Sequence, residues 1–475
     1  MMQPTGIVLV VGRRGPARLS ATKSSPRPAL AEPGGSGTTP GPSLPRRLAS
    51  GLGSDCNEVN PGGARKGVTP RQFGVSSPPT RETAFLLYPG TVDPKSFEPN
   101  PSGRVRRVPG PAPYSAFFPA AIPRTLRLSQ ELSLRLSSAD QALGRLVGVG
   151  QVLPNPHLVS SAYSRREAVS SLAIEGTQTS LGEVLSSEAV EGVRRPEVRE
   201  VRNYIEAFDY GLDRLSSLPV SLRLVRELHE RLLSGIGGPH RTPGEFRTSQ
   251  NWIGPEGATL ADAVFIPPPP EAMHEALDDW ERYLHEDPRL PHLVRCALLH
   301  YQFETIHPFL DGNGRLGRLL ISFYLVERGI LSLPLLYVSP YLEARRSEYY
   351  EHLQRVRLKG DFHSWIAFFL DAVASQALDA VRRAESLLRV FSAYRDRLRK
   401  ARIRGGAVEL VDQLLANPYM TTSRAARFLN VSQQGAAYAI QRLVDANVVQ
   451  PEGQIGAARL YVAREVLEVL EAPSA

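Results

Sequence analysis

The sequence predicts a mainly α-helical protein with one short β-hairpin and a C-terminal winged helix-turn-helix. Apolar residues recur at helical spacing over most of residues 126–398. Glycines, prolines and short apolar pairs over 244–270 interrupt that pattern and predict a loop with a hairpin. Over 405–470, three short helical patterns precede two strand patterns around the turn Pro-Glu-Gly-Gln-Ile-Gly, an order typical of a winged helix.

The same patterns divide the chain into parts. Residues 1–100 are rich in Pro, Gly, Ser and Arg and show no sustained period, so we expect them to be disordered. The other predicted parts are an N-terminal helical region over 110–215, a second helical region over 220–375, a linking helix over 376–400 and the winged helix over 405–470. The expected helices cover 158–174, 196–216, 219–234, 271–286, 291–305, 314–328, 340–357 and 361–398, and in the winged helix 407–416, 423–429 and 433–446.

The net charge gives no argument for DNA binding by the helical regions. The chain has 56 basic and 48 acidic residues, a formal charge of +8. Eleven of the basic and four of the acidic residues lie in 1–85, which leaves 45 and 44 for a nearly neutral remainder. Since a basic surface is what attracts a protein to DNA phosphates, bulk charge is no sign of such a partner here.

Cysteine usage and hydropathy favour an intracellular protein. With Cys56 and Cys296 alone, a disulfide framework and a multi-cysteine zinc site are excluded. The first apolar run, residues 7–12, is too short for a membrane span, and basic residues follow it instead of preceding it as in a secretory signal. We therefore expect a cytoplasmic protein that does not associate with a membrane.

Residues 307–318, HPFLDGNGRLGR, are the segment most indicative of specific chemistry. They lie between two helical patterns and so form a loop that opens into a helix. Gly312 and Gly314 leave backbone N–H groups uncovered, and the helix N-terminus adds positive potential, which together suit phosphate oxygens. Arg315 and Arg318, three residues apart on the first turn, can present forked donors to a polyphosphate.

Two further residues of this loop suit phosphoryl transfer. Asp311 is a hard oxygen ligand beside the glycines, which fits Mg²⁺ bridging phosphates. His307, followed by the stiff Pro308, can accept a proton from an incoming hydroxyl. Each feature alone is common in loops and on solvated helix faces, but their combination within twelve residues predicts a site for a nucleotide.

This segment matches the signature HPFx(D/E)GNGRxxR of the Fic domain family at every specified position. The resemblance runs from about residue 114 to the end, to the bacterial members that carry an N-terminal helical extension and a C-terminal winged helix. It rests also on RTPGEFRTSQNWI, FIPPPP, HYQFETIHPF and LPLLYVSPYLEARRSEYY, at 241–253, 265–270, 300–309 and 333–350. It implies a helical Fic catalytic domain over 220–375 with a short β-hairpin flap.

The resemblance implies a protein adenylyltransferase, which moves AMP from ATP to a Ser, Thr or Tyr hydroxyl of a target protein. His307 would be the general base, Asp311 would hold Mg²⁺ between the α- and β-phosphates, and Arg315 and Arg318 would hold the β- and γ-phosphates. Gly312, Asn313 and Gly314 would line the anion hole. The full set of implied ATP contacts is Gly312, Asn313, Gly314, Arg315, Leu316, Gly317, Arg318, Tyr349 and Tyr350.

Two other features follow from the family pattern. Ala263, Val264 and Phe265 resemble the flap, which pairs with the target backbone as an added strand. Tyr349 and Tyr350 stand where the family contacts adenine or ribose. Seven residues after the second tyrosine the family commonly has Asn, whereas this chain has Arg357.

Residues 171–176, SLAIEG, match the inhibitory motif (S/T)xxxE(G/N) of the same family. Glu175 stands at the C-terminal end of a predicted helix, where the helix dipole disfavours a carboxylate unless a cation meets it. The resemblance makes Ser171 and Glu175 the inhibitory residues and Arg318 that cation, so that Glu175 would displace the γ-phosphate. In some relatives this glutamate also supports removal of AMP.

Several alternatives stay open from the sequence. The chain could be a DNA-binding regulator whose Fic domain senses a nucleotide, or the loop could transfer another phosphate-containing group or remove AMP. DNA contacts would come from the winged helix, through Arg424, Arg427, Gln433, Gln434, Gln441 and Arg442. The apolar helix over 364–390 is either core or the seam of a homodimer. His300, too far from other histidines for zinc, is expected to pack or to hydrogen-bond under the catalytic loop.

Overall fold

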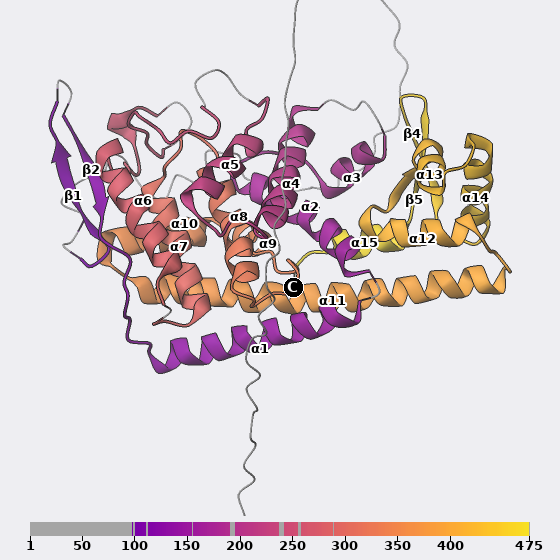
Figure 1. Ribbon diagram of the computed structural model, residues 1–475, viewed down its shortest axis with the longest axis horizontal. Helices are drawn as coiled ribbons and strands as arrows, with labels where there is room; N and C mark the ends of the chain where they lie inside the picture. The colour runs from indigo at the N-terminus through magenta and orange to yellow at the C-terminus, as the bar shows by residue number, and fades with distance from the viewer. Residues whose placement is uncertain are drawn as a thin grey trace, which may run out of the picture. The chain divides into compact units, whose positions relative to one another are not determined.

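The computed structural model describes residues 97, 100–110, 113–153, 155–190, 195–236, 242–254, 258–287 and 289–474. The predicted fold class, mainly α, is confirmed (Figure 1). The tail over 1–100 lies outside the described residues except for Phe97 and Asn100. The side chain of Asn100 donates a hydrogen bond to the carbonyl of Arg357, so this end of the expected tail is attached to the helical part.

Serine side chains cap three of the five described N-terminal helices. The five helices are α1 (Gln130–Val152), α2 (Pro156–Ile174), α3 (Leu181–Ala189), α4 (Pro196–Arg214) and α5 (Leu222–Leu232). Ser129, Ser180 and Ser221 accept hydrogen bonds from the first turns of α1, α3 and α5, as N-cap serines do. Helix α3 lies where no helix was expected, between the predicted helices at 158–174 and 196–216.

Helices α7 and α8 form the centre of the core, because almost every residue of both is buried. Helix α7 spans His292–Ile306 and α8 spans Asn313–Glu327. Around them lie α6 (Pro270–His285), α9 (Ser339–Ala344), α10 (Arg346–Lys359) and α11 (Phe362–Lys400). The single helix predicted over 340–357 is wrong, since Arg345 (φ −122°, ψ 40°) separates α9 from α10. No glycine or proline marks that break, so tertiary packing overrides the local pattern.

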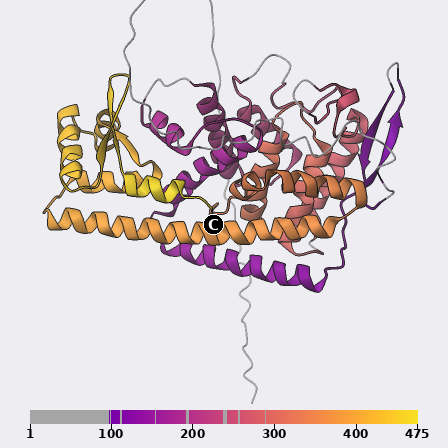
Figure 2. The ribbon, with the colours of Figure 1, turned by 180° about the vertical axis from the view of Figure 1, so that it is seen from behind.

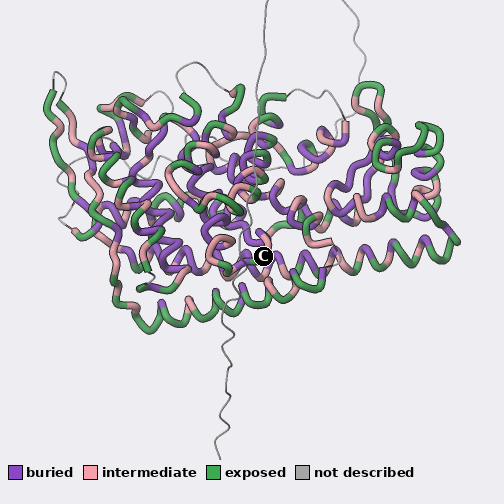
Figure 3. Tube along the Cα trace, viewed as in Figure 1, coloured by how far each residue is buried: buried purple, intermediate pink, exposed green. Residues whose placement is uncertain are grey.

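The long helix α11 lies beside α1, as the front and rear views both show (Figures 1 and 2). Buried residues gather where the helices face one another, and the outer side of α1 is exposed (Figure 3). Among the described helices, α11 alone is long and apolar enough to cross a membrane by length and composition. Its most apolar window of 18 residues is 61% buried within the protein, as is typical of a helix that packs in a protein core.

The strands near the N-terminus correct the sequence prediction. Strand β1 (Gly103–Val108), between the predicted tail and the predicted helical region, pairs antiparallel with β2 (Tyr114–Pro119), which lies where the helical region was expected. The N–H of Phe117 donates to the carbonyl of Ile266, so β2 borders the predicted flap. The flap itself is only an isolated bridge between Ile253 and Phe265, because the prolines at 267–270 have no N–H to extend a ladder.

The C-terminal unit combines helices with a three-stranded antiparallel sheet of order β3-β5-β4. Its elements are α12 (Gly406–Ala416), β3 (Tyr419–Thr421), α13 (Thr422–Leu429), α14 (Gln433–Asp445), β4 (Gln450–Ile455), β5 (Ala458–Val462) and α15 (Arg464–Glu471). Strand β3 and helix α15 were not expected. Gln433, Gln434 and Gln441 are exposed on α14, as a DNA contact would require, but Arg424 is half-buried. The winged-helix assignment and its DNA contact stay predictions.

Gly211 tests the packing of α4 on α8, because a Cβ there would lie 2.3 Å from the ring of Phe323. We expect Gly211→Ala to destabilise the protein by about 1–3 kcal/mol through overpacking, measured as a lower midpoint of urea unfolding. Gly148 on α1 is the matched control, since no heavy atom lies within 4 Å of its Cβ position. Gly148→Ala should be neutral or stabilising by about 0.4–1 kcal/mol, and equal loss in both variants would contradict this packing.

Candidate active site

The loop between α7 and α8 begins and ends in left-handed backbone. His307 ends α7 with φ 50° and ψ 60°, and Gly312 precedes α8 with φ 75°. A positive φ is uncommon for a residue with a side chain, and such residues persist where the surroundings hold them, often at functional sites. Here the turn at His307 directs the chain away from α7 and into a loop that returns at the N-terminus of α8.

Side chains from 244–254 hold the backbone of His307 in this conformation. Its carbonyl accepts hydrogen bonds from Nε of Arg247 (3.0 Å) and Nδ2 of Asn251 (3.1 Å). The Asn251 amide also donates to the carbonyl of Phe309 (2.8 Å). The sequence pattern assigned no role to Arg247 or Asn251. Both lie in the segment RTPGEFRTSQNWI, and the resemblance of that segment to the family was the only signal in the sequence that pointed to them.

Asn313 closes the loop from the other side. Its Oδ1 accepts from the N–H of Phe309 (2.9 Å) and its Nδ2 donates to the carbonyl of the same residue (2.8 Å). The ring of His229 stacks on Phe309 with centroids 3.7 Å apart, and its Nε2 lies 3.0 Å from the carbonyl oxygen of Asp311. The side chain of Asn313, expected to line an anion hole, is therefore used to shape the loop, which leaves its backbone N–H for a ligand.

Glu175 meets two arginines at the start of α8. Its Oε1 lies 2.9 Å from Nη2 of Arg318, and its Oε2 lies 2.8 Å from Nε of Arg315. Ser171 adds two more contacts to Arg318, through Oγ to Nε and through its carbonyl to Nη2, both 2.8 Å. The sequence nominated Arg318 as the cation at the end of α2, and the structure adds Arg315.

Charge and burial make this contact strong. The side chains of Arg315 and Arg318 are 5% and 2% exposed, while Glu175 keeps 27%. Burial alone would lower the pKa of Arg318, but the carboxylate of Glu175 and further neighbours outweigh it, so the pKa is raised. A Cβ on Gly314 would lie 2.8 Å from both Glu175 Oε1 and Arg318 Nη1, so a larger residue there would have to displace the ends of these two side chains.

His307 is held in its neutral form. Burial, followed by the positive charges of Arg247 and Arg357, lowers the pKa of His307 to about 3. At neutral pH the imidazole therefore carries no charge and has a nitrogen able to accept a proton. This state is the one required of a general base, although a pKa this low weakens its basicity until a bound substrate changes its surroundings.

Asp311 is the candidate magnesium ligand. Its Oδ1 accepts from the N–H of Gly312 (2.7 Å) and from Nη2 of Arg315 (3.0 Å), and the side chain is 30% exposed. Among the described residues, no group of three or more His, Cys, Asp or Glu side chains could hold a metal. A single accessible carboxylate fits Mg²⁺, which is commonly held by one or two carboxylates together with substrate phosphates.

Comparisons with known proteins agree with this geometry. The model of the Fic/DOC family N-terminal region matches residues 133–213, and that of the Fic/DOC family matches residues 219–325. Residues 133–213 and 219–325 are thus similar to the two conserved regions of the Fic/DOC family.

Relatives named "Protein adenylyltransferase Fic" align with about half of the chain. One from Nematostella vectensis is 30% identical over 52% of this chain and 55% of its own length, and one from Drosophila mojavensis is 30% identical over 50% and 45%. The chain thus spans about half the length of the curated relatives it matches. A solved Fic family protein from Desulfovibrio desulfuricans G20 is 20% identical with a TM-score of 0.45, covering 71% of this chain and 97% of its own.

Three of the expected nucleotide contacts in this Fic domain are turned to the core instead. Leu316 is fully buried, and a Cβ on Gly317 would lie 2.4 Å from Oε1 of Glu304, so both serve the contact of α7 with α8. Tyr349 is 1% exposed, and its hydroxyl lies 2.9 Å from Nε2 of His300. Tyr350, 36% exposed, is the tyrosine of the pair that a nucleotide can reach in this conformation.

Arg357, the departure from the Fic pattern, connects the flap to the catalytic loop. Its guanidinium lies 3.8 Å from the ring centroid of Phe265 and donates to Oγ1 of Thr305 (3.2 Å). Ile253 bonds both the N–H and the carbonyl of Phe265 (3.1 and 2.8 Å) and the N–H of Val264 (2.8 Å). The backbone of Phe265 is thus already paired and Ala263 is fully buried, so of the three expected flap residues only Val264, through its carbonyl, is left for a target strand.

His300 supports the loop, as expected from the sequence, and it gives a pH test. Its Nδ1 lies 3.1 Å from the carbonyl oxygen of Gly317, and burial lowers its pKa to about 3. Because the unfolded chain takes up this proton near pH 6.5 and the folded one does not, the stability contributed by a neutral His300 is lost as pH falls from 6.5 towards 3.

We expect the difference in unfolding free energy between the wild type and His300→Gln to shrink by about 1.4 kcal/mol per pH unit below pH 6. Urea unfolding of both proteins at pH 7, 6 and 5 measures it, and all other titrating groups cancel in the difference. A difference that does not change with pH would show that His300 is not buried as a neutral imidazole.

Proposed function

We propose that this chain is a protein adenylyltransferase that uses ATP to modify hydroxyl groups of Ser, Thr or Tyr in target proteins. The observation that carries the proposal is the pair of buried guanidinium groups at the N-terminus of α8, beside a neutral His307. Such an arrangement offers a triphosphate positive charge and backbone N–H groups on one side and a base on the other. The relatives named as protein adenylyltransferases support the same activity.

In the proposed reaction, His307 takes the proton of the target hydroxyl as its oxygen attacks the α-phosphorus of ATP. The bond from the α-phosphorus to the bridging oxygen breaks, pyrophosphate leaves, and AMP stays joined to the target through a new phosphoester bond. Arg315 and Arg318 hold the β- and γ-phosphates and offset the charge that develops on the leaving group. Asp311 would hold Mg²⁺, which when bound neutralises phosphate charge.

The target would approach along the flap. With Phe265 paired to Ile253 and Ala263 buried, the proposed strand addition uses the carbonyl of Val264, and pairing with Ala263 would require the flap to move. Backbone pairing positions an acceptor side chain without reading much sequence, so it suits Ser, Thr and Tyr alike. The hydroxyl then has to reach His307, whose backbone is fixed by Arg247 and Asn251.

We further propose that the structure is the inhibited form. Glu175 takes the positions beside Arg315 and Arg318 that phosphate oxygens of ATP would need. Because two buried cations without an anion are costly, we expect either the carboxylate of Glu175 or the γ-phosphate of ATP to pair with them, and these two groups compete for the same site. ATP that enters while Glu175 stays would lack the γ-phosphate contact and be misplaced for transfer.

Glu175→Gly should raise automodification from labelled ATP by at least about tenfold, the scale of a typical coupling between sites. Glu175→Gln should act in the same direction, with Glu206→Gln on the exposed side of α4 as the matched control without effect. His307→Ala should abolish labelling in every background. Mass spectrometry of the product should show the adduct of AMP, and an adduct of another mass would contradict the proposed transfer of AMP. Equal labelling by the wild type and Glu175→Gly would contradict the proposed inhibition by Glu175.

A further inference from the structure

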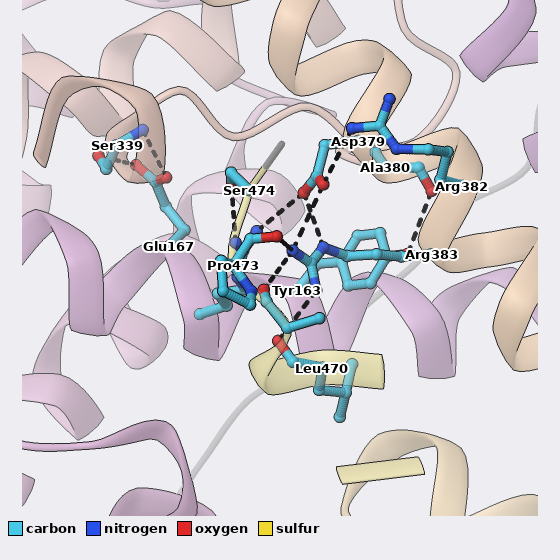
Figure 4. Close-up of polar contacts among 12 residues, drawn as sticks. Tyr163, Glu167, Ser339, Asp379, Ala380, Arg382, Arg383, Leu470, Pro473 and Ser474 are labelled. Atoms are coloured by element: carbon cyan, nitrogen blue, oxygen red, sulfur yellow. Dashed lines mark hydrogen bonds and ion pairs between the residues drawn. The ribbon is translucent and has the colours of Figure 1, made fainter. Parts of the chain in front are cut away.

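Arg383, on α11, binds the end of the described chain. Its side chain is 5% exposed and is paired with Asp379 one turn earlier (2.7 Å). The guanidinium donates to the carbonyls of Val469 (2.5 Å) and Ala472 (2.5 Å), with longer contacts to Leu470 and Pro473 (Figure 4). The last carbonyls of a helix have no partner within it, so one buried arginine here completes the C-terminus of α15.

The inhibitory helix α2 joins the same cluster through Arg166. Nη1 of Arg166 lies 3.2 Å from Oδ2 of Asp379, and Nη2 donates to Oγ of Ser474 (2.7 Å). Beside it, Tyr163 of α2 donates to the carbonyl of Ala380 (3.2 Å; Figure 4). The buried Arg383, the partly buried Arg166 and the exposed Arg382 thus share one aspartate. The carbonyl and hydroxyl groups of residues 469–474 therefore accept from donors of Arg383 and Arg166 that Asp379 does not satisfy.

The C-terminal unit also holds the segment that follows Glu175. Oε1 of Glu471 accepts from the N–H of Gly182 at the start of α3 (3.0 Å). Asn417 donates to the carbonyl of Leu185 (2.9 Å), and Thr421 donates to that of Ala189 (3.1 Å). The chain is therefore attached to the C-terminal unit on both sides of Glu175, before it through α2 and after it through α3.

Helix α2 connects this cluster to the candidate active site, because it carries Arg166 and its C-cap residue is Glu175. Arg166 and Glu175 are nine residues apart, about 13 Å along one continuous helix, so a shift of α2 at Arg166 moves the inhibitory carboxylate as well. A second buried contact, from Glu167 to the N–H of Ser339 (3.0 Å; Figure 4), ties α2 to α9 within the Fic domain. The position of Glu175 thus depends on contacts with two parts of the protein.

We infer that residues 406–474 act as a latch on the inhibitory helix: Arg383, Asp379 and Arg166 hold α2 through the C-terminal segment, and release of that segment frees Glu175 from Arg315 and Arg318. The inference rests on the proposed inhibitory role of Glu175. It assigns the C-terminal unit a regulatory function within the chain, because any change that moves residues 469–474 leaves buried donors of Arg383 without acceptors and removes the contact of Arg166 with Ser474.

Two variants open the latch without touching the nucleotide site. Arg383→Met keeps the volume of the side chain and removes its donors, and a chain ending at Glu471 removes the carbonyls of Ala472 and Pro473 and the hydroxyl of Ser474. Arg389→Met is the matched control, since Arg389 is exposed on the same helix. Automodification from labelled ATP and hydrogen exchange of the α2 amides are measured for each full protein after its folding is checked by circular dichroism.

Both latch variants should raise automodification at least about fivefold and speed exchange in α2, while Arg389→Met leaves both unchanged. In the Glu175→Gly background, Arg383→Met should not increase automodification further, because inhibition by Glu175 is already absent. A change that only destabilises the protein would lower automodification in that background. The inference is wrong if both latch variants are folded and yet show the same automodification and the same hydrogen exchange of the α2 amides as the wild type. Should Glu175→Gly itself fail to label, the proposed function fails, and exchange in α2 alone decides whether the latch exists.

Discussion

The site is organised by the need of two buried guanidinium groups for an anion. Arg315 and Arg318 are fixed on the first two turns of α8 with hardly any access to water, and the helix N-terminus adds further positive potential. Leaving one member of such a pair without its partner typically costs about 3–5 kcal/mol. Glu175, itself at the unfavourable negative end of α2, satisfies both arginines at once. Under the proposed function, the carboxylate of Glu175 and the phosphates of ATP are thus alternatives at one electrostatic site.

The surrounding structure keeps that site in place by backbone contacts from distant segments. Arg247 and Asn251 bond the carbonyl of His307, and Asn313 bonds both polar groups of Phe309. These bonds allow the left-handed turn at His307, which the chain alone would disfavour. On the other side, α2 must be held so that Glu175 reaches α8, and contacts to the Fic domain and to the C-terminal unit share that task.

Much of this could be predicted from the sequence, because local patterns determined it. Helical periodicity predicted α7 and α8, and the motif between them indicated the loop, its glycines and its arginines. The strand GRVRRV has no apolar alternation, so β1 could not be predicted; its hairpin is held by a contact of Phe117 with Ile266, far along the chain. The engagement of Arg315 by Glu175, the loop closure by Asn313 and the burial of Tyr349 likewise depend on tertiary contacts that no local pattern contains.

The central claim is that Glu175 and the γ-phosphate compete for Arg315 and Arg318. It is tested most directly by isothermal titration of ATP and ADP into His307→Ala, which prevents turnover, with and without Glu175→Gly. The account predicts that ATP and ADP bind with similar affinity while Glu175 is present, and that its removal makes ATP bind at least about tenfold more tightly than ADP, the scale of one charge-assisted contact. An ATP-to-ADP affinity ratio that is the same in both proteins would contradict it.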